Sequence, residues 1–202
     1  MQFDKQPACQ SPQRQDGFHM PVWVNNYRPK RLKRPNAGRI FQVPRKRKAM
    51  RDARVILQRL RRDYGQLPLT QRTPVKLAIL RCICPFVFEE LLLHSCTDHG
   101  YRVARSCYTH DGGIDGAFYP WEGARFLIQA KRYAQEIDPE DLLKFVGVVH
   151  REQAAGGVFM HTGLTCSDSR FIEDNCRDIM ILSGEDLVAF LWNEGDCGLV
   201  AA

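Results

Sequence analysis

The sequence predicts an α/β fold: a mixed central β-sheet flanked by helices, preceded by a basic N-terminal arm that carries one helix. Residues 113–133 have the pattern of a β-hairpin. After residue 133, helical and extended patterns alternate, which is typical of parallel strands joined by crossover helices. With 202 residues, the chain can bury one substantial core and still carry an arm or a small second unit.

The charge of the chain divides it into two parts. Residues 1–76 hold 19 Lys or Arg against 4 Asp or Glu, a net of +15, and residues 77–202 hold 10 against 19, a net of −9. A segment as basic as the first attracts nucleic acid, with an anionic membrane surface as the alternative. We expect residues 1–76 to form a partly disordered basic arm with one amphipathic helix, residues 77–196 a folded domain, and residues 197–202 a tail.

Membrane, secreted and zinc-binding classes are disfavoured. No stretch has the length of a transmembrane helix, and residues 1–17 lack the apolar centre of a signal peptide. We therefore expect a soluble, cytoplasmic protein, associated with the nucleoid if bacterial. The 8 cysteines form no Cys-x-x-Cys pair, which indicates buried thiols in a reducing compartment. His94, Cys96 and His99 are not spaced as a zinc site.

The basic arm is expected to contact phosphates. Residues 28–35 and 45–48 are runs of Lys and Arg, for which a nuclear-import signal is the alternative. Apolar residues recur at helical spacing over residues 47–64, with arginines on the remaining surface. Such a helix can lie on DNA, on a membrane or on a partner, and DNA is favoured. The predicted DNA contacts here are Lys30, Arg31, Lys33, Arg34, Arg45, Lys46, Arg47, Lys48, Arg51 and Arg54.

Residues 69–85 are expected to form a linker and then a short helix over 75–84. Pro85 starts a second helix over residues 86–99, which Gly100 ends. On this helix Glu89 projects with the apolar stripe, whereas Glu90 falls nearer the polar flank. An inward acid is costly unless it binds something. The alternative for Glu89 is a partly exposed carboxylate favoured by the helix dipole.

A strand is expected over residues 101–108, followed by the hairpin with strands at 116–119 and 125–132. Gln129 and Lys131 lie two residues apart and therefore on the same face. A turn after the glycines at 112 and 113 can bring the carboxylate of Asp115 beside Gln129. Two oxygen donors and an ammonium then meet in one small volume, which suits metal-assisted hydrolysis of a phosphodiester.

Other assignments of these residues stay open. Asp111 is a second candidate acid, although Asp-Gly-Gly is more typical of a turn. Gln129 and Lys131 taken alone fit the surface of an edge strand. His110 and His161 lie near the ends of the motifs, and we assign them no role.

The C-terminal part is expected to alternate helix and strand. Asp138 and Pro139 start a helix that turns Leu142, Phe145, Val146 and Val149 toward the core. The glycines at 156 and 157 are expected to break the chain before a strand over 158–162. The remaining expected elements are a helix over 167–176, a strand over 179–182, and a last helix capped by Ser183-x-x-Asp186 that ends near Trp192.

Two motifs carry a resemblance to a known family. Asp-Gly-Gly-Ile-Asp (111–115) followed by Ile-Gln-Ala-Lys-Arg-Tyr (128–133) resembles the catalytic core of Mrr-type restriction endonucleases, a branch of the PD-(D/E)xK nucleases in which Gln replaces the second acid. The resemblance runs from about residue 86 to residue 191. It implies a restriction-endonuclease-like core of order α-β-β-β-α-β-α-β-α and makes residues 77–196 the catalytic domain. It also implies that Glu89 is the helix-borne acid of the family.

The working hypothesis is an Mg²⁺-dependent DNA endonuclease, with Mn²⁺ as a substitute. The metal would be held by Asp115, Gln129 and Glu89, and the attacking water would be oriented by Lys131. The DNA backbone would be contacted by Arg132 and Tyr133. Double-stranded DNA is the expected partner, without a membrane or small-molecule substrate, and a homodimer is expected because cutting both strands usually calls for two sites. By resemblance the activity would serve restriction of modified foreign DNA or repair. The alternatives are a DNA-binding accessory protein of plasmid or phage type and a membrane-surface or partner-binding adaptor that uses the basic helix.

Overall fold

The computed structural model describes residues 43–67, 69–105, 113–120 and 123–193, and it confirms an α/β fold with a mixed sheet. The strands lie in the order β1-β2-β3-β4-β5, with the first two pairings antiparallel and the last two parallel. The strands are β1 (Arg102–Arg105), β2 (Gly116–Tyr119), β3 (Phe126–Lys131), β4 (Gly156–His161) and β5 (Ile179–Ser183). The helices are α2 (Val43–Tyr64), α3 (Leu69–Cys82), α4 (Pro85–Asp98), α5 (Pro139–Arg151), α6 (Ser167–Asn175) and α7 (Gly184–Trp192).

The predicted hairpin is present, and it lies inside the sheet. β2 has the predicted bounds, and β3 pairs with it in the register Gly116↔Ile128. On its other side β3 pairs in parallel with β4. Since β3 is the third of five strands, the alternative that placed Gln129 and Lys131 on an edge strand is wrong. Any site on β3 is therefore held by hydrogen bonds on both sides.

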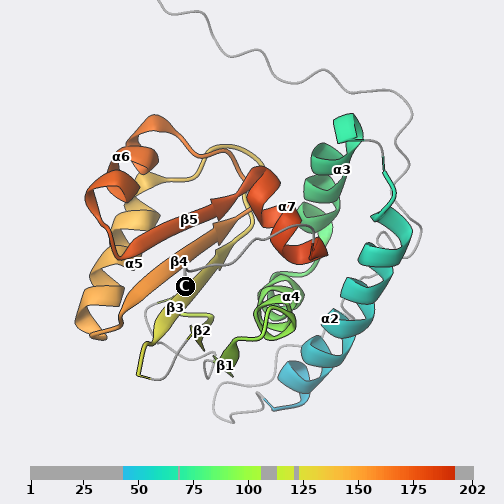
Figure 1. Ribbon diagram of the computed structural model, residues 1–202, viewed down its shortest axis with the longest axis horizontal. Helices are drawn as coiled ribbons and strands as arrows, with labels where there is room; N and C mark the ends of the chain where they lie inside the picture. The colour runs from blue at the N-terminus through green and yellow to red at the C-terminus, as the bar shows by residue number, and fades with distance from the viewer. Residues whose placement is uncertain (1–42, 68, 106–112, 121–122, 194–202) are drawn as a thin grey trace, which may run out of the picture.

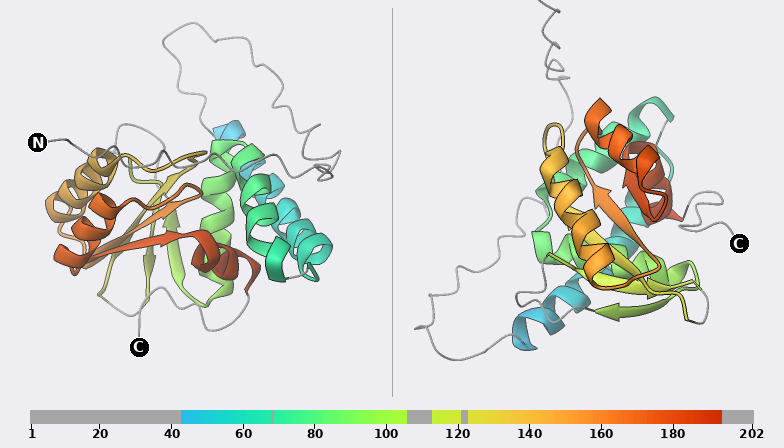
Figure 2. Two further views of the ribbon diagram at one scale, coloured as in Figure 1. Left: turned by 90° about the horizontal axis from the view of Figure 1, so that it is seen from above. Right: turned by 90° about the vertical axis from the view of Figure 1, so that its left-hand side faces the viewer.

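Helices cover both faces of the sheet (Figure 1). α5 and α6 connect the parallel strands and pack on one face. α4 and α7 pack on the other, and Figure 2 shows α2 and α3 outside them. The face under α4 and α7 holds the larger apolar core, and the face under α5 and α6 a smaller one. No helix in the described parts of the chain is long and apolar enough to cross a membrane.

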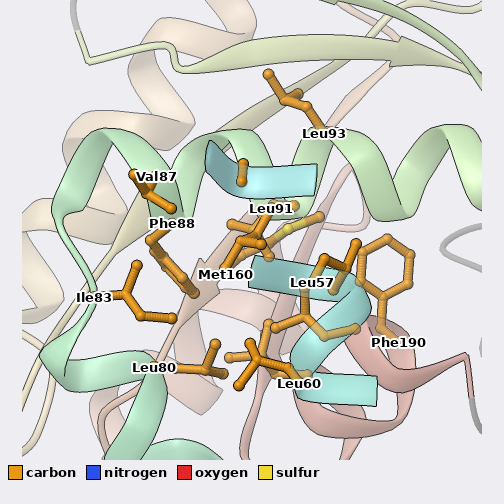
Figure 3. Packing of buried hydrophobic residues seen from close by; sticks show 14 of the residues in the cluster. Leu57, Leu60, Leu80, Ile83, Val87, Phe88, Leu91, Leu93, Met160 and Phe190 are labelled. Atoms are coloured by element: carbon orange, nitrogen blue, oxygen red, sulfur yellow. The ribbon is translucent and has the colours of Figure 1, made fainter. Parts of the chain in front are cut away.

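α4 is buried on nearly all sides because α2 lies against it. Figure 3 shows Leu57 and Leu60 of α2 gathered with Leu91 of α4 and Phe190 of α7. The expectation that Glu90 lies on a polar flank is therefore wrong: its side chain is fully buried. The guanidinium of Arg105 at the end of β1 compensates its charge, with Nε 3.0 Å from Oε2.

α2 confirms the predicted basic amphipathic helix, although it begins at Val43 and not near residue 47. Most of its apolar side chains are buried in the domain core, while Val55 and arginines such as Arg51 and Arg54 are exposed. Arg61 joins the helix to the rest of the fold, donating from Nε to the carbonyl of Leu191 and from Nη1 to Asp98. The buried apolar positions are Ala49, Ala53, Ile56, Leu57 and Leu60.

The linker expected before residue 75 is wrong, because α3 is helical from Leu69 and contains Pro74. Burial of Leu77, Ile79 and Leu80 stabilises this helix despite the amide hydrogen that proline lacks. Residues 76 and 77, where the boundary of the arm was placed, both lie within α3, and the division of the chain there stays a prediction.

The glycines at 156 and 157 lie inside β4, so the expected break is wrong. A Cβ on Gly156 would lie 2.6 Å from the ring of Phe126, and one on Gly157 would lie 2.6 Å from Val149. The glycines thus allow close packing on both faces of the sheet, which is the other common reason for glycine in a strand.

The C-terminal helices begin in different ways. Asp138 caps α5 as predicted, because its carboxylate accepts from the backbone N–H of Glu140. The predicted cap of α7 is wrong in part: Ser183 lies at the N-cap position, but its side chain makes no capping hydrogen bond. Its hydroxyl lies instead 3.0 Å from the Oγ1 of Thr165, since the end of β5 lies beside the loop after β4.

Candidate active site

The site begins where the chain enters β2. The backbone N–H of Asp115 donates to the carbonyl of Ile128 at 2.9 Å, and Oδ2 of Asp115 accepts from the N–H of Ala130 at 2.7 Å. These two bonds hold the Asp115 carboxylate beside the peptide units that flank Gln129. The sequence-based expectation that a short turn brings Asp115 next to Gln129 is consistent with this geometry.

Gln129 is buried in the centre of the sheet, with 7% of its surface exposed. Gly113 makes room for it: this residue has a φ of +88°, and a Cβ there would lie 2.5 Å from Nε2 of Gln129. Within the described structure, Oε1 of Gln129 is buried and has no hydrogen-bond partner. An unpaired buried carbonyl oxygen is costly, which makes it a candidate ligand atom.

Glu89 supplies a second acid from α4. Its Oε2 is also buried without a hydrogen-bond partner among the described residues. Burial raises the pKa of Glu89 to about 8, the negative charges of Asp115 and then Glu90 add to the rise, and the charge of Arg132 opposes it. The carboxyls of Glu89 and Asp115 therefore share one electrostatic environment, and a cation there would favour the ionised form of both.

Lys131 ends β3 on the same face as Gln129. Its Nζ lies 3.5 Å from Oδ2 of Asp141, in the first turn of α5. The hydroxyl of Tyr133 donates to the same carboxylate oxygen. This hydrogen bond, followed by the charge of Lys131, lowers the pKa of Asp141 against the opposing effect of burial, so the carboxylate is ionised at neutral pH.

Sequence reasoning missed the contact of Asp141 with Lys131. One signal for it was available. A short connection from a strand to a crossover helix brings the first turn of the helix back beside the end of that strand.

His161 is a second residue to which the sequence assigned no role. It ends β4 directly opposite Lys131 in the parallel register, and it is fully buried. Burial lowers the pKa of His161 to about 4, so the ring is neutral at pH 7. Its Nε2 lies 3.2 Å from the hydroxyl of Thr165, and its ring packs edge-on against Tyr133. His161 therefore supports the residues around Lys131 by packing.

A cation would have to use an amide oxygen at this site. No three His, Cys, Asp or Glu side chains in the described parts of the chain come together as a metal-binding group. The oxygens of Asp115, Glu89 and Gln129 are nevertheless of the hard type that Mg²⁺ binds, and Oε2 of Glu89 and Oε1 of Gln129 have no hydrogen-bond partner among the described residues. The donor set therefore fits a hard divalent ion that keeps part of its water shell.

The predicted DNA contacts lie in three places. Residues 30–34 fall outside the described residues, as do the side chains of residues 45–47. Lys48, Arg51 and Arg54 are exposed on α2, where a hollow of about 420 Å³ lies between that helix and His94. Beside the site, Arg132 donates from Nη1 to the carbonyl of Arg81, and Tyr133 binds Asp141. Direct DNA contact by any of these residues stays a prediction.

Comparisons with known proteins agree with the predicted resemblance. The model of the Mrr_cat restriction endonuclease family matches residues 80–191. Two solved structures are similar to this chain. "MspJI Restriction Endonuclease in Complex with 27-mer Oligonucleotide" is 22% identical with a TM-score of 0.40, covering 72% of this chain and 33% of that one. "DNA modification-dependent restriction endonuclease AspBHI" is 17% identical with a TM-score of 0.37, covering 88% of this chain and 46% of that one.

This chain thus spans a third to about half of the length of the two solved structures. Comparison with curated proteins gave no match. The family match includes the helix that carries Glu89, the hairpin with Asp115 and Gln129, and the strand end with Lys131. Since it extends over more than half of the chain, the protein belongs to the Mrr_cat family of restriction endonucleases.

Proposed function

We propose that this protein is an Mg²⁺-dependent DNA endonuclease of the Mrr type, which accepts Mn²⁺ as a substitute. The observation that supports it best is the pair of buried oxygens without a hydrogen-bond partner in the described structure, on Glu89 and Gln129, close to the charged carboxylate of Asp115. A folded protein keeps such groups where they bind something, and a divalent cation satisfies all three.

Each residue has a distinct role in this proposal. Asp115, Gln129 and Glu89 would hold the cation, which when bound supplies Lewis-acid activation of water and of the phosphate. Lys131, at the end of β3, orients the attacking water and stabilises negative charge on the phosphate oxygens. Asp115 is held by the backbone N–H of Ala130, so its carboxylate does not need to reorganise when substrate enters.

The amide of Gln129 sets the charge of the site. The two acids contribute −2 in their ionised forms, where a third carboxylate at position 129 would give −3. We therefore expect weaker metal affinity than a three-carboxylate site would have. The raised pKa of Glu89 adds to this, because metal binding must displace the proton that this carboxyl holds near neutral pH.

Double-stranded DNA is the proposed substrate, and restriction of modified foreign DNA or repair is the proposed role. The exposed Lys48, Arg51 and Arg54 on α2 favour a polyanion, as does the net charge of +15 over residues 1–76. A homodimer would provide the two sites that cutting both strands requires.

The test is cleavage of supercoiled plasmid by the full chain in Mg²⁺, with Asp115→Ala and Lys131→Ala as inactive variants and Glu140→Gln as a surface control. We expect nicking by the wild type and the control only, and its loss in EDTA. Nicking that persists in both inactive variants, or a wild type that does not cut in Mg²⁺ or Mn²⁺, would contradict the proposal.

A DNA-binding accessory protein is the second candidate. The basic surface of α2 lies outside the residues that match the family, which favours a binding function beyond the catalytic core. In the same experiment, retardation of the plasmid without nicking by the wild type would support this candidate over the nuclease.

A further inference from the structure

The ion pair between Lys131 and Asp141 is the feature next to the candidate site that the roles above leave unexplained. The Nζ of Lys131 lies 3.5 Å from Oδ2 of Asp141, and the Lys131 side chain is 37% exposed. A partly exposed ion pair of this kind contributes little to stability. The more important consequence of this ion pair is that it fixes the position of the Lys131 ammonium.

Three acids start α5, and each has a different environment. Asp138 caps the helix through the N–H of Glu140. Glu140 is exposed and lies 3.4 Å from Lys144, one turn along the helix. Asp141 turns toward the end of β3, where Lys131 and Tyr133 meet its carboxylate. Asp138 therefore caps α5 and Glu140 adds a negative charge that favours its dipole. The carboxylate of Asp141 instead contacts Lys131 and Tyr133.

We propose that Asp141 is a positioning residue for Lys131, holding the ammonium at the end of β3 where the scissile phosphate would lie. This inference rests on the nuclease function proposed above. It extends that function by adding a residue, Asp141, that acts through Lys131, together with the hydrogen bond by which Tyr133 holds Asp141.

The physical reason lies in the flexibility of lysine. A four-carbon side chain that reaches into solvent samples many rotamers, and fixing it costs conformational entropy. The positive end of the α5 dipole also repels an ammonium beside it. The Asp141 carboxylate offsets this repulsion and limits the rotamers of Lys131 before substrate binds. A preorganised ammonium then loses less entropy in the transition state.

Tyr133 fixes the carboxylate in turn. Its hydroxyl donates to the oxygen of Asp141 that faces Lys131, and its ring packs edge-on against the buried ring of His161. Gly163 leaves space for Tyr133, because a Cβ there would lie 2.7 Å from the tyrosine Cβ. Asp141 is therefore supported by buried residues of β4 and the loop after it, so it does not move freely with solvent.

The experiment measures the rate of cleavage and the affinity for DNA separately, in the whole chain of residues 1–202. Single-turnover nicking of supercoiled plasmid is measured in Mg²⁺ with enzyme in excess, and DNA affinity is measured by fluorescence anisotropy with Ca²⁺ in place of Mg²⁺. The variants are Asp141→Asn, Asp141→Glu and Tyr133→Phe. Glu140→Gln is the matched control, because it removes one negative charge from the same helical turn without touching Lys131.

We expect Asp141→Asn to lower the single-turnover rate by roughly tenfold to a hundredfold with unchanged DNA affinity, since misplacement of a catalytic group acts on the rate. Asp141→Glu should recover part of the rate, and Tyr133→Phe should lower it less than Asp141→Asn does. The control should cut like the wild type. Thermal unfolding of each variant should match the wild type within a few degrees, because the carboxylate is partly exposed.

Three results would overturn the positioning role: wild-type cutting by Asp141→Asn, an equal loss in Glu140→Gln, or a loss of DNA affinity as large as the loss of rate. These results differ from failure of the proposed function, in which the wild type itself does not cut and Lys131→Ala changes nothing.

Discussion

Arg132 donates from Nη1 to the backbone carbonyl of Arg81 at 2.8 Å, while the guanidinium of Arg81 donates from Nε to the carbonyl of Thr162 at 2.9 Å. The end of α3 is thereby joined to the ends of β3 and β4. Burial raises the pKa of Glu89 and the charge of Arg132 opposes that rise, so this link lies next to the candidate metal site. The two arginines connect α3 to the strands that carry the candidate site.

Substitution of Arg81 tests this link. Arg81→Ala removes the donors to a buried carbonyl, and we expect the free energy of unfolding to fall by about 1.5–3 kcal/mol in urea denaturation. Arg62→Ala is the control, because Arg62 is exposed and pairs only with its neighbour Asp63 among the described contacts, so no measurable change in the free energy of unfolding is expected. Equal losses in the two variants would show that the link contributes nothing specific.

Arg105 tests the buried charge of Glu90. Arg105→Ala leaves the carboxylate of Glu90 buried without its arginine, which we expect to cost about 3–5 kcal/mol in the same assay. The double variant Glu90→Gln with Arg105→Ala removes the charge as well and should recover part of that loss. No recovery in the double variant would contradict a contribution of the Glu90–Arg105 pair to stability.

Glu89 gives a pH dependence in metal-free protein. Its pKa is raised to about 8, so between about pH 4.5 and pH 8 the folded state binds more protons than the unfolded state, and stability falls as the pH rises through this window. The full shift corresponds to at most about 5 kcal/mol, and solvent at the half-buried carboxyl reduces this to about 2 kcal/mol.

Unfolding of Glu89→Gln in EDTA measures this effect. The variant should match the wild type near pH 4.5 and exceed it by about 2 kcal/mol near pH 9, because glutamine carries no charge to desolvate. Added Mg²⁺ should reduce the difference at the higher pH by stabilising the wild type. A difference that does not change with pH would mean that Glu89 does not titrate in this window.

The two glycines Gly157 and Gly147 make a matched pair. Gly157→Ala would place a Cβ 2.6 Å from Val149 and 2.8 Å from the ring of Phe145, and we expect a loss of about 2–3 kcal/mol in unfolding free energy. Gly147 lies on α5, and no atom of the described residues lies within 4 Å of a Cβ there, so Gly147→Ala should stabilise by about 0.5–1 kcal/mol. Tolerance of alanine at 157 would contradict close packing there.

The exposed face of α2 is tested by charge reversal. Arg51→Glu with Arg54→Glu should weaken binding to any duplex and reduce the slope of log affinity against log salt by about 2, because two phosphate contacts are lost. Lys144→Glu is the control, an exposed reversal on α5. The same loss in the control would indicate an effect of net charge alone.

Local patterns predicted the backbone geometry around Gln129, while the roles of these residues stay predictions. Alternation along residues 126–131 assigned Gln129 and Lys131 to one face, and the turn before β2 places the Asp115 carboxylate at the backbone N–H of Ala130, next to Gln129. The periodicity of the helix after Pro85 was sufficient to predict that the side chain of Glu89 faces inward. These inferences succeeded because each depends on residues close together in the chain, where geometry follows from spacing.

Features that depend on distant contacts were not predictable in the same way. Glu90 is buried because α2 covers α4, and periodicity within α4 does not reveal a covering helix. Two consecutive glycines usually indicate a loop. In β4 they lie within a strand, and the close approach of Phe126 and Val149 is the reason that no larger residue fits there. The contact of Asp141 with Lys131 depends on how closely α5 returns to β3.

The packing of α2 against α4 has a practical consequence for anyone who wishes to shorten this protein. A fragment trimmed to the family-matched residues 80–191 would lack one wall around α4, and the leucines of that helix would face water. Such a fragment is expected to aggregate, and a lack of cleavage by it would not test the catalytic roles proposed here. Point substitutions in the intact chain are the better way to divide binding from cleavage here.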